Sequence, residues 1–319
     1  MEFYDFKKEK DFVKICKNGN LNKAQEYITD NPYIDLTWEE CQCFIVACEN
    51  GHKNIIQWLL TLPCQWDYDI ELFDLSFAKA CANGYLDIAK YLFEIKNIDI
   101  SYCDYYSFIK ACSNGHLHII KWLYEKAPFI NISHENELAF YHACKNGHSK
   151  IIKWLLTIKP EIDIGVNNSN SFIKGCLSGN LDTFKLMMEI YPYMSIYCNF
   201  CFIIIKLIDE DTNKNENFEI FKYIYNNASE QDIKNYIYPV VLSRYNYQIL
   251  TKDKHKKRTR ILNFILNKNR ELLHLIYISS YFRNKYNISK NKDNFLDILS
   301  FDKNTKNRPK IKTTKLEEN

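Results

Sequence analysis

The chain has 319 residues, of which 46% are hydrophobic and 25% are charged, a composition that is ordinary for a folded, water-soluble protein. No apolar run reaches the roughly 18 residues that a membrane-spanning helix needs, and the charged start MEFYDFKKEKDF lacks the apolar segment of a signal peptide. We therefore expect neither a membrane protein nor a secreted one, and predict a cytoplasmic or nuclear location. The net charge is only +3, but residues 252–319 hold 18 basic and 7 acidic side chains, so the preceding residues are net acidic.

Glycines mark a repeat along most of the chain. They recur at intervals of 31 to 33 residues, at Gly19, Gly51, Gly84, Gly115, Gly147 and Gly179. Most lie within a short segment similar to ACSNGHLHIIKWL, which begins at residue 111. A fixed interval near 32 residues indicates stacked copies of one supersecondary unit, because each unit buries its apolar side only against its neighbours.

The unit at residues 100–131 predicts a pair of helices. Ser107 is expected to cap the first helix by accepting a backbone hydrogen bond. Phe108, Ala111 and Cys112 then lie on one apolar face, since residues three and four apart share a side of a helix. Gly115 ends this helix, because glycine adopts the left-handed conformation without steric penalty. A second apolar helix follows, and an extended segment leads to the next unit.

Two columns of the repeat predict its core. One holds a phenylalanine in every unit: Phe12, Phe44, Phe77, Phe108, Phe140 and Phe172. The other holds a cysteine: Cys16, Cys48, Cys81, Cys112, Cys144 and Cys176. A free cysteine behaves as a small hydrophobic residue and is often buried. The twelve cysteines of the chain are therefore interpreted as core residues of a reducing compartment rather than as a disulfide framework.

The pattern resembles the ankyrin repeat, whose family pattern contains A-A/C-x-x-G-H between two helices. Residues 108–123 follow that pattern closely, and the clear resemblance covers residues 36–195. It implies an all-α solenoid of about 6 to 8 helix-turn-helix units with short hairpin loops. The family's T-P-L-H motif is replaced by Tyr106–Ile109, which leaves the hairpin geometry open. The residue style also resembles ankyrin proteins of giant DNA viruses of amoebae.

The remaining segments are assigned by analogy with this repeat. The first unit is more polar, with Lys23 and Glu26 in otherwise apolar columns, which suits a capping repeat whose outer face meets water. After residue 195, apolar segments predict two degenerate repeats with insertions. The expected division is residues 1–35 as an N-terminal capping repeat, 36–195 as five clear repeats, 196–270 as two degenerate repeats, 271–301 as a helical cap and 302–319 as a disordered basic tail.

Several groups of residues could carry chemistry but fit the repeat better. Cys112, His116 and His118 could bind zinc, and His142 with Cys144 could form a nucleophilic pair. Both cysteines occupy the core column, however, whereas a reactive cysteine needs an exposed, electropositive setting. The single C-x-x-C at residues 198–201 lacks the second pair of ligands that zinc normally requires. We therefore predict no catalytic residues, no metal and no cofactor.

The predicted function is protein binding by a non-enzymatic scaffold, which the resemblance places on the hairpin tips and the first helices. Its partner is expected to be a protein, a host protein if the viral resemblance holds, with neither a small-molecule substrate nor a membrane. The matching columns give Trp38, Glu39, Glu71, Asp74, Tyr102, Tyr105, His134, Glu137, Asn167 and Ser169. Tyr102 and Tyr105 are the strongest candidates, since tyrosine is frequent at binding hot spots, and the acids favour a partner with a basic patch.

Two alternatives concern the C-terminal part. Residues 262–282 are apolar and helical enough to recruit a ubiquitin ligase, although they lack the L-P-x-E start of an F-box. The basic cluster within residues 252–260 could bind nucleic acid, anionic lipid or an import receptor, or could be a solvated loop. Its residues are Lys254, Lys256, Lys257, Arg258 and Arg260.

Overall fold

The computed structural model describes residues 6–63, 70–132, 134–162, 166–190, 199–210, 215–241 and 260–268. The chain divides into two compact units, residues 1–262 and 263–319, and nearly all described residues belong to the first. Within the described residues, all regular structure is helical. No helix among them is long and apolar enough to cross a lipid bilayer.

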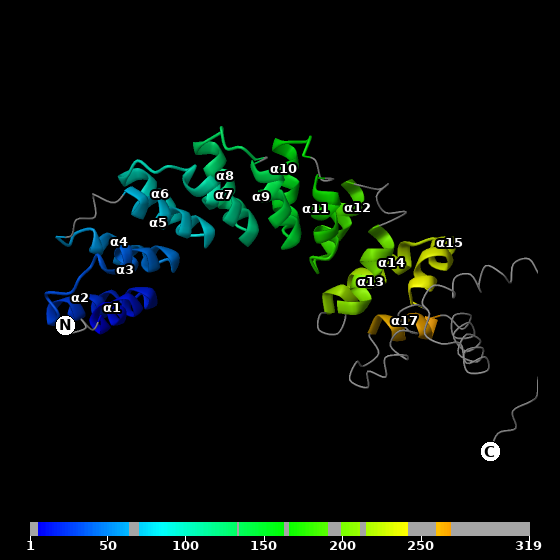
Figure 1. Cartoon of the computed structure of the whole chain (residues 1–319), viewed down its shortest axis with the longest axis horizontal. Coiled ribbons are helices and arrows are strands. Elements are labelled where there is room, and N and C mark those ends of the chain that lie inside the picture. Colours follow the sequence, from blue (N-terminus) through cyan, green and yellow to red (C-terminus); the bar gives the residue numbers. More distant parts are fainter. Residues whose placement is uncertain are drawn as a thin grey trace, which may run out of the picture. The chain divides into compact units, whose positions relative to one another are not determined.

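Helices α1 to α14 follow one another in pairs along the first unit (Figure 1). Their bounds are α1 (Lys7–Asn18), α2 (Leu21–Asp30), α3 (Trp38–Glu49), α4 (Lys53–Leu59), α5 (Ile70–Ala82), α6 (Leu86–Ile95), α7 (Tyr102–Asn114), α8 (Leu117–Lys126), α9 (His134–Lys145), α10 (Ser149–Ile158), α11 (Val166–Cys176), α12 (Leu181–Ile190), α13 (Asn199–Glu210) and α14 (Asn215–Asn227). A short α15 (Glu230–Asp232) continues into the π-helical η2 (Ile233–Ile237), and α17 spans Arg260–Lys268.

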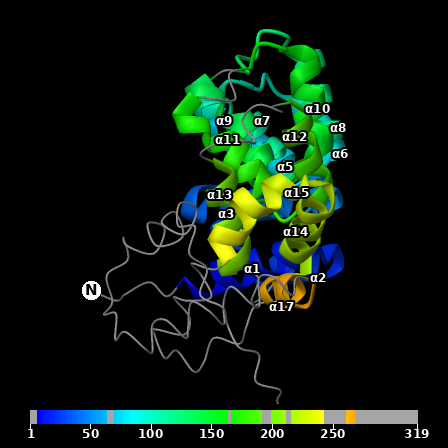
Figure 2. The same ribbon diagram turned by 90° about the vertical axis from the view of Figure 1, so that its right-hand side faces the viewer.

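The first helices of successive pairs pack against one another. Helix α1 contacts α3, and the series continues through α5, α7, α9 and α11 to α13. Each second helix packs on the first helix of its own pair. In Figure 2 the first helices α5 to α11 accordingly lie on one side of the array and the second helices α6 to α12 on the other. The predicted stack of helix-turn-helix units is thus confirmed.

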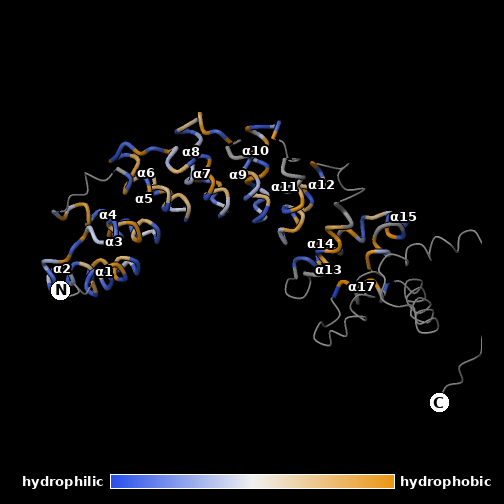
Figure 3. The backbone as a smooth tube through the Cα atoms, viewed as in Figure 1, coloured by the Kyte–Doolittle hydropathy of each residue, from blue (hydrophilic) through white to orange (hydrophobic). Residues whose placement is uncertain are grey.

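The core follows the two predicted columns. Every phenylalanine of the first column is at most 2% exposed, and every cysteine of the second is fully buried. Figure 3 shows the resulting pattern, in which hydrophobic and hydrophilic residues alternate along the helices of each pair. Each helix therefore buries one side, and the shared core runs through the stack from unit to unit.

The turn between paired helices requires glycine for two reasons. Gly115 ends α7 with φ of 91°, in the left-handed region that disfavours other residues. In addition, a Cβ atom on Gly115 would lie 2.8 Å from Cε1 of His148, which belongs to the next unit. Gly84 repeats both features, with φ of 87° and Nδ1 of His116 2.6 Å from the hypothetical Cβ. The glycine column therefore allows close contact between units as well as a tight turn.

The expected role of Ser107 is wrong. Helix α7 begins at Tyr102, and Ser101, the residue that precedes it, makes no capping hydrogen bond through its side chain. Ser107 lies inside the helix and is only 3% exposed. The cause is a left-handed turn inside the start of α7, where Cys103, Asp104 and Tyr105 all have positive φ. Residues 39–41 of α3 form an equivalent left-handed turn two units earlier.

The ends of the array are described in part. In α2 only Ala24 is buried, and Lys23 and Glu26 are exposed as expected. Helices α13, α14 and α17 cover apolar segments that were assigned to degenerate repeats. Residues 271–301 and 302–319, the expected cap and tail, lie outside the described residues. The proposed boundaries between these regions stay predictions.

Candidate functional site

The first helices expose the side that points away from the core. In α7, Phe108, Ala111 and Cys112 are buried, whereas Tyr106 and Lys110 on the opposite side are half-buried. The four-residue spacing of Tyr106 and Lys110 places both on one face of the helix. We call the corresponding side of α7, α9 and α11 the first-helix face; it contains Tyr106, Lys110, Ser113, Leu138, His142, Lys145, Lys174 and Leu177.

Basic residues occupy one repeated position of this face. Lys110, His142 and Lys174 are spaced by 32 residues, and the same column contains Lys14 and Lys79 in earlier units. The ammonium nitrogen Nζ of Lys110 lies 5.4 Å from the centre of the Tyr106 ring, close enough for an attraction between cation and ring. The sequence interpretation did not single out this column, although its interval is that of the glycines.

His142 lies at the centre of this positive charge. Its pKa is lowered, first by burial and then by the charges of Lys110 and Lys145. The ring of Tyr141 lies 5.4 Å from that of His142, in an edge-to-face arrangement. Aromatic and cationic groups of α7 and α9 thus form a single surface.

Two of the acidic candidate residues are not on the surface. Asp74 is 5% exposed, and its Oδ1 accepts a hydrogen bond of 2.9 Å from the backbone N–H of Asp99. Glu137 is 7% exposed, and its Oε1 lies 3.2 Å from Nζ of Lys159. Both carboxylates face inward because they hold the segment that follows the second helix of their own unit. They are therefore removed from the candidate contact surface, which becomes less acidic than expected.

The remaining described candidates lie at the N-terminal ends of the first helices. Glu39 and Glu71 are exposed, whereas Trp38, Tyr102 and Tyr105 are half-buried. The Trp38 ring is 6.2 Å from that of Phe6. Burial and, to a smaller extent, a hydrogen bond with Cys103 raise the pKa of Tyr102 to about 12. These aromatic rings are held in place while part of each stays accessible.

Other candidates are only partly described. His134 is the first residue of α9, and Asn167 and Ser169 belong to α11, but their side chains are outside the described residues. Residues 251–259 are also outside them, including Lys254, Lys256, Lys257 and Arg258. Arg260 is exposed at the start of α17, with its guanidinium carbon 5.7 Å from the centre of the Phe218 ring. Of the basic cluster, Arg260 thus lies beside an aromatic ring.

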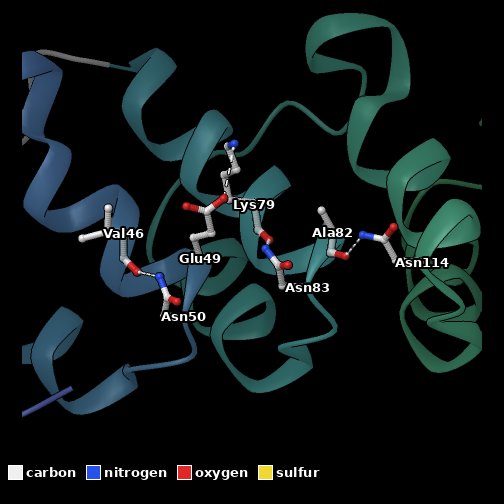
Figure 4. Close-up of polar contacts among 7 residues, drawn as sticks. All are labelled: Val46, Glu49, Asn50, Lys79, Ala82, Asn83 and Asn114. Atoms are coloured by element: carbon white, nitrogen blue, oxygen red, sulfur yellow. Dashed lines mark hydrogen bonds and ion pairs between the residues drawn. The ribbon is translucent and has the colours of Figure 1, made fainter. Parts of the chain in front are cut away.

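Asparagines that precede the glycines donate hydrogen bonds to carbonyls at the ends of helices, a role that the sequence interpretation missed. The last carbonyls of a helix lack partners within it. The amide Nδ2 of Asn50 donates to the Val46 carbonyl at 2.8 Å, and that of Asn83 donates to the Lys79 carbonyl at 3.0 Å (Figure 4). Both asparagines thus cap the helix that they end.

Later asparagines of the same column connect neighbouring units instead. Asn114 donates to the Ala82 carbonyl of the preceding unit at 2.7 Å (Figure 4), and Asn146 donates to the Ser113 carbonyl at 2.6 Å. These bonds fix the spacing between successive first helices, and hence the spacing of the cations on the first-helix face.

Histidines after the glycines also bind backbone carbonyls of the preceding unit. Nε2 of His52 lies 2.8 Å from the Lys17 carbonyl oxygen, and Nε2 of His148 lies 2.9 Å from that of Ser113. The pKa of His116 is lowered, mainly by burial and by the nearby His118, although a hydrogen bond with the Ala82 backbone opposes the shift. These rings connect adjacent units.

The proposed metal and nucleophile arrangements are incompatible with this geometry. Burial raises the pKa of the Cys112 and Cys144 thiols, which disfavours the thiolate that either chemistry needs. Among the described residues, no group of three or more histidine, cysteine, aspartate or glutamate side chains is arranged to hold a metal ion. Cys112 therefore belongs to the packing of the repeat, and His116 and His118 to the contacts between units.

The match to a family model agrees with the geometry. Residues 77–168 and 108–197 match a family model described as ankyrin repeats in three copies. The fold is thus that of an ankyrin-repeat solenoid, and residues 77–197 carry the matching repeats. None of the curated proteins matches the chain. Among solved structures, the chain is similar to the crystal structure of the human ASB11 ankyrin repeat domain, with 17% identity, a TM-score of 0.42, and coverage of 56% of this chain and 82% of that one.

Proposed function

We propose that this protein is a non-enzymatic scaffold that binds another protein through its first helices and their N-terminal turns. The observation that carries this proposal is the stack of first helices, in which α7, α9 and α11 each present a partly accessible side chain at the same repeated position. Ankyrin repeats generally mediate protein–protein interaction, and such a repeated face suits an extended or flat partner surface.

The aromatic residues at the helix starts are the proposed anchors. Trp38, Tyr102 and Tyr105 are half-buried, so each side chain is partly covered and keeps an accessible part, which limits the entropy lost when a partner binds. Tyrosine and tryptophan are also the residues that most often dominate binding energy. Glu39 and Glu71 lie exposed at the same ends of their helices and are proposed to contact the rim of the partner.

The test is capture of binding partners by the full chain and by a Tyr102→Ala/Tyr105→Ala variant. Captured proteins are identified by mass spectrometry, and their affinities are then measured with purified components. We expect the double variant to bind at least about tenfold more weakly. A matched variant, Lys121→Ala/Lys153→Ala, changes exposed residues of the second helices α8 and α10 and should bind as the unchanged chain does. Equal binding by all three proteins would reject this surface.

The source of the partner is a separate proposal. The residue style resembles ankyrin proteins of giant DNA viruses of amoebae, and on that basis we propose a host protein, in the cytoplasm or nucleus, as the partner. Capture from amoebal lysate and from an unrelated eukaryotic lysate shows whether the partner is specific to an amoebal host. Partners that bind equally from both sources would count against a host-specific role.

Two other roles, adaptor of a ubiquitin ligase and nucleic-acid binding, depend on the C-terminal part. Only the start of residues 262–282 is described, as part of α17, and the basic cluster lies mostly outside the described residues. Neither role is favoured by a described contact. Loss of a ligase component from a chain that ends at residue 267, or nucleic-acid affinity that falls steeply with salt, would support the respective role.

A further inference from the structure

The first-helix face of α7, α9 and α11 is positively charged, in contrast to the net acidic chain that surrounds it. We infer that it docks an acidic, extended segment of a partner protein, an inference that rests on the proposed scaffold function and specifies the partner's chemistry. The docking residues, here called the basic face, are Tyr106, Lys110, His142, Lys145 and Lys174 of the first-helix face, together with Tyr141, whose ring adjoins that of His142.

The spacing of the cations suits an extended polypeptide. Lys110, His142 and Lys174 take the same position on three first helices that pack in succession. Packed helices lie about 8–10 Å apart, and an extended chain advances roughly 10 Å in three residues. A segment that crosses the three helices can therefore place an acidic side chain near each cation with about two residues between acids.

The lysines of the basic face have no acidic partner among the described residues. No described carboxylate lies within ion-pair distance of Lys110, Lys145 or Lys174. Other lysines of the array differ, since Nζ of Lys79 lies 3.5 Å from Oε1 of Glu49, as Figure 4 shows. The column thus changes from a lysine paired with a carboxylate in α5 to lysines without a described carboxylate partner in α7 and α11.

Positive charges also act on one another across this face. The charges of Lys110 and Lys145 both disfavour protonation of His142. A bound carboxylate would relieve that repulsion, because it places opposite charge beside all three groups. The neutral form of His142 is therefore favoured in the unbound face, and a bound acidic segment is expected to raise the pKa of His142.

Aromatic rings favour a polypeptide over a bare anion. The Tyr106 ring lies beneath the Lys110 ammonium, and the Tyr141 ring contacts His142. Rings beside cations contact apolar side chains placed between acidic ones, as at the centres of protein interfaces. A long nucleic acid is disfavoured, because residues 1–251 are net acidic and repel a polyanion beyond the basic face.

The test measures binding of defined probes to the full chain by fluorescence anisotropy. The first probe is a labelled peptide of about 12 residues with glutamate at every third position and tyrosine or leucine between. The second has lysine in place of glutamate, and the third is a single-stranded oligonucleotide of equal length. We expect the acidic peptide to bind, more weakly at higher salt, and the other two to bind at least about tenfold more weakly.

Charge reversal identifies the surface. Lys110→Glu/Lys174→Glu should weaken binding of the acidic peptide at least about tenfold, whereas the matched Lys121→Glu/Lys153→Glu on the second helices should change it less than about twofold. Circular dichroism verifies that both variants keep the helical content of the unchanged chain. Equal losses in the two variants, no binding of the acidic peptide, or oligonucleotide binding that is stronger than peptide binding and is weakened by Lys110→Glu/Lys174→Glu would each overturn the inference.

The outcomes also separate this inference from the proposed function. If the acidic peptide fails to bind while captured partners still depend on Tyr102 and Tyr105, the scaffold function stands and the acidic specificity is wrong. If the peptide binds at the basic face but no protein partner depends on the first helices, the scaffold proposal fails instead.

Discussion

The carboxylate of Asp74 accepts a hydrogen bond from the backbone N–H of Asp99, at 2.9 Å from its Oδ1. The two residues are 25 positions apart, and the bond joins α5 to the segment that enters α7. Asp99 in turn accepts hydrogen bonds from the backbone N–H and the hydroxyl of Ser101, at 2.8 and 2.6 Å. The buried Asp74 of α5 thus positions the segment that leads into the next unit. The first helix of that unit, α7, carries two of the proposed anchors, Tyr102 and Tyr105.

Substitution of Asp74 by alanine is expected to destabilise the array. The change removes a part-buried hydrogen bond from the backbone N–H of Asp99 to a carboxylate, and such a bond to a charged group typically contributes about 1.5–3 kcal/mol. Asp74→Asn keeps an oxygen at this position and should cost less. Glu71→Ala, on the exposed side of the same helix, should alter the unfolding free energy by less than about 0.5 kcal/mol. Urea unfolding followed by circular dichroism gives the comparison, and equal effects of Asp74→Ala and Glu71→Ala would contradict it.

Gly115→Ala is expected to destabilise through two separable effects. The left-handed backbone alone costs about 1–2 kcal/mol for a residue with a Cβ, and the methyl group would also meet the His148 ring at 2.8 Å. If both effects operate, Gly115→Ala combined with His148→Ala should be less destabilising than the sum of the single changes. Thermal unfolding of the four proteins measures this coupling. Strict additivity would show that the ring moves away freely and that only the backbone matters.

The repeat could be predicted because it depends on the spacing of residues that are close together in the sequence. Phe108 and Cys112 lie four residues apart on one helix face, and Gly115 follows at a fixed distance, so a linear pattern was enough. Asp74 could not be interpreted in this way, since an acid near a helix start is usually exposed and its partner lies 25 residues further on. Ser107 was misassigned because the left-handed turn before it has no glycine that would mark it.

In the candidate site too, local spacing predicted some features, whereas others depend on contacts between residues far apart in the sequence. The N-terminal ends of the first helices follow from the column alignment, and Tyr102 lies where the alignment placed it. Whether Glu137 faces the partner or the core depends on Lys159, which pairs with it from the end of the neighbouring helix α10. The cations of the basic face, in contrast, could have been found, because Lys110 and Lys174 share one position of the repeat.

Acidification below neutral pH is expected to destabilise the protein through His116. Its pKa is lowered in the folded state, mainly by burial, relative to about 6.5 in an unfolded chain. As the pH falls through 6.5, the unfolded state takes up the proton first, so the unfolding free energy decreases until the folded pKa is also passed. Unfolding temperatures measured between about pH 7.5 and 5.5 should therefore decline, and less so for His116→Gln. An unchanged slope in that variant would assign the effect to other groups.

Thiol reactivity is expected to separate the cysteines by their place in the repeat. Among the described cysteines, Cys103 is exposed, whereas those of the core column are buried. Burial also raises the pKa of the Cys112 thiol, so that little of the reactive thiolate forms. Iodoacetamide should therefore label Cys103 in the native protein at least about 100-fold faster than Cys112.

Labelling is located by mass spectrometry of peptides, and Cys103→Ser serves as the control that removes the fast site. In denaturant both positions should react at similar rates, since unfolding removes the burial that protects Cys112. Comparable native labelling of Cys112 and Cys103 would mean that the contact between α7 and its neighbours opens frequently. In that case the first helices would not hold the fixed spacing on which docking of an extended segment depends.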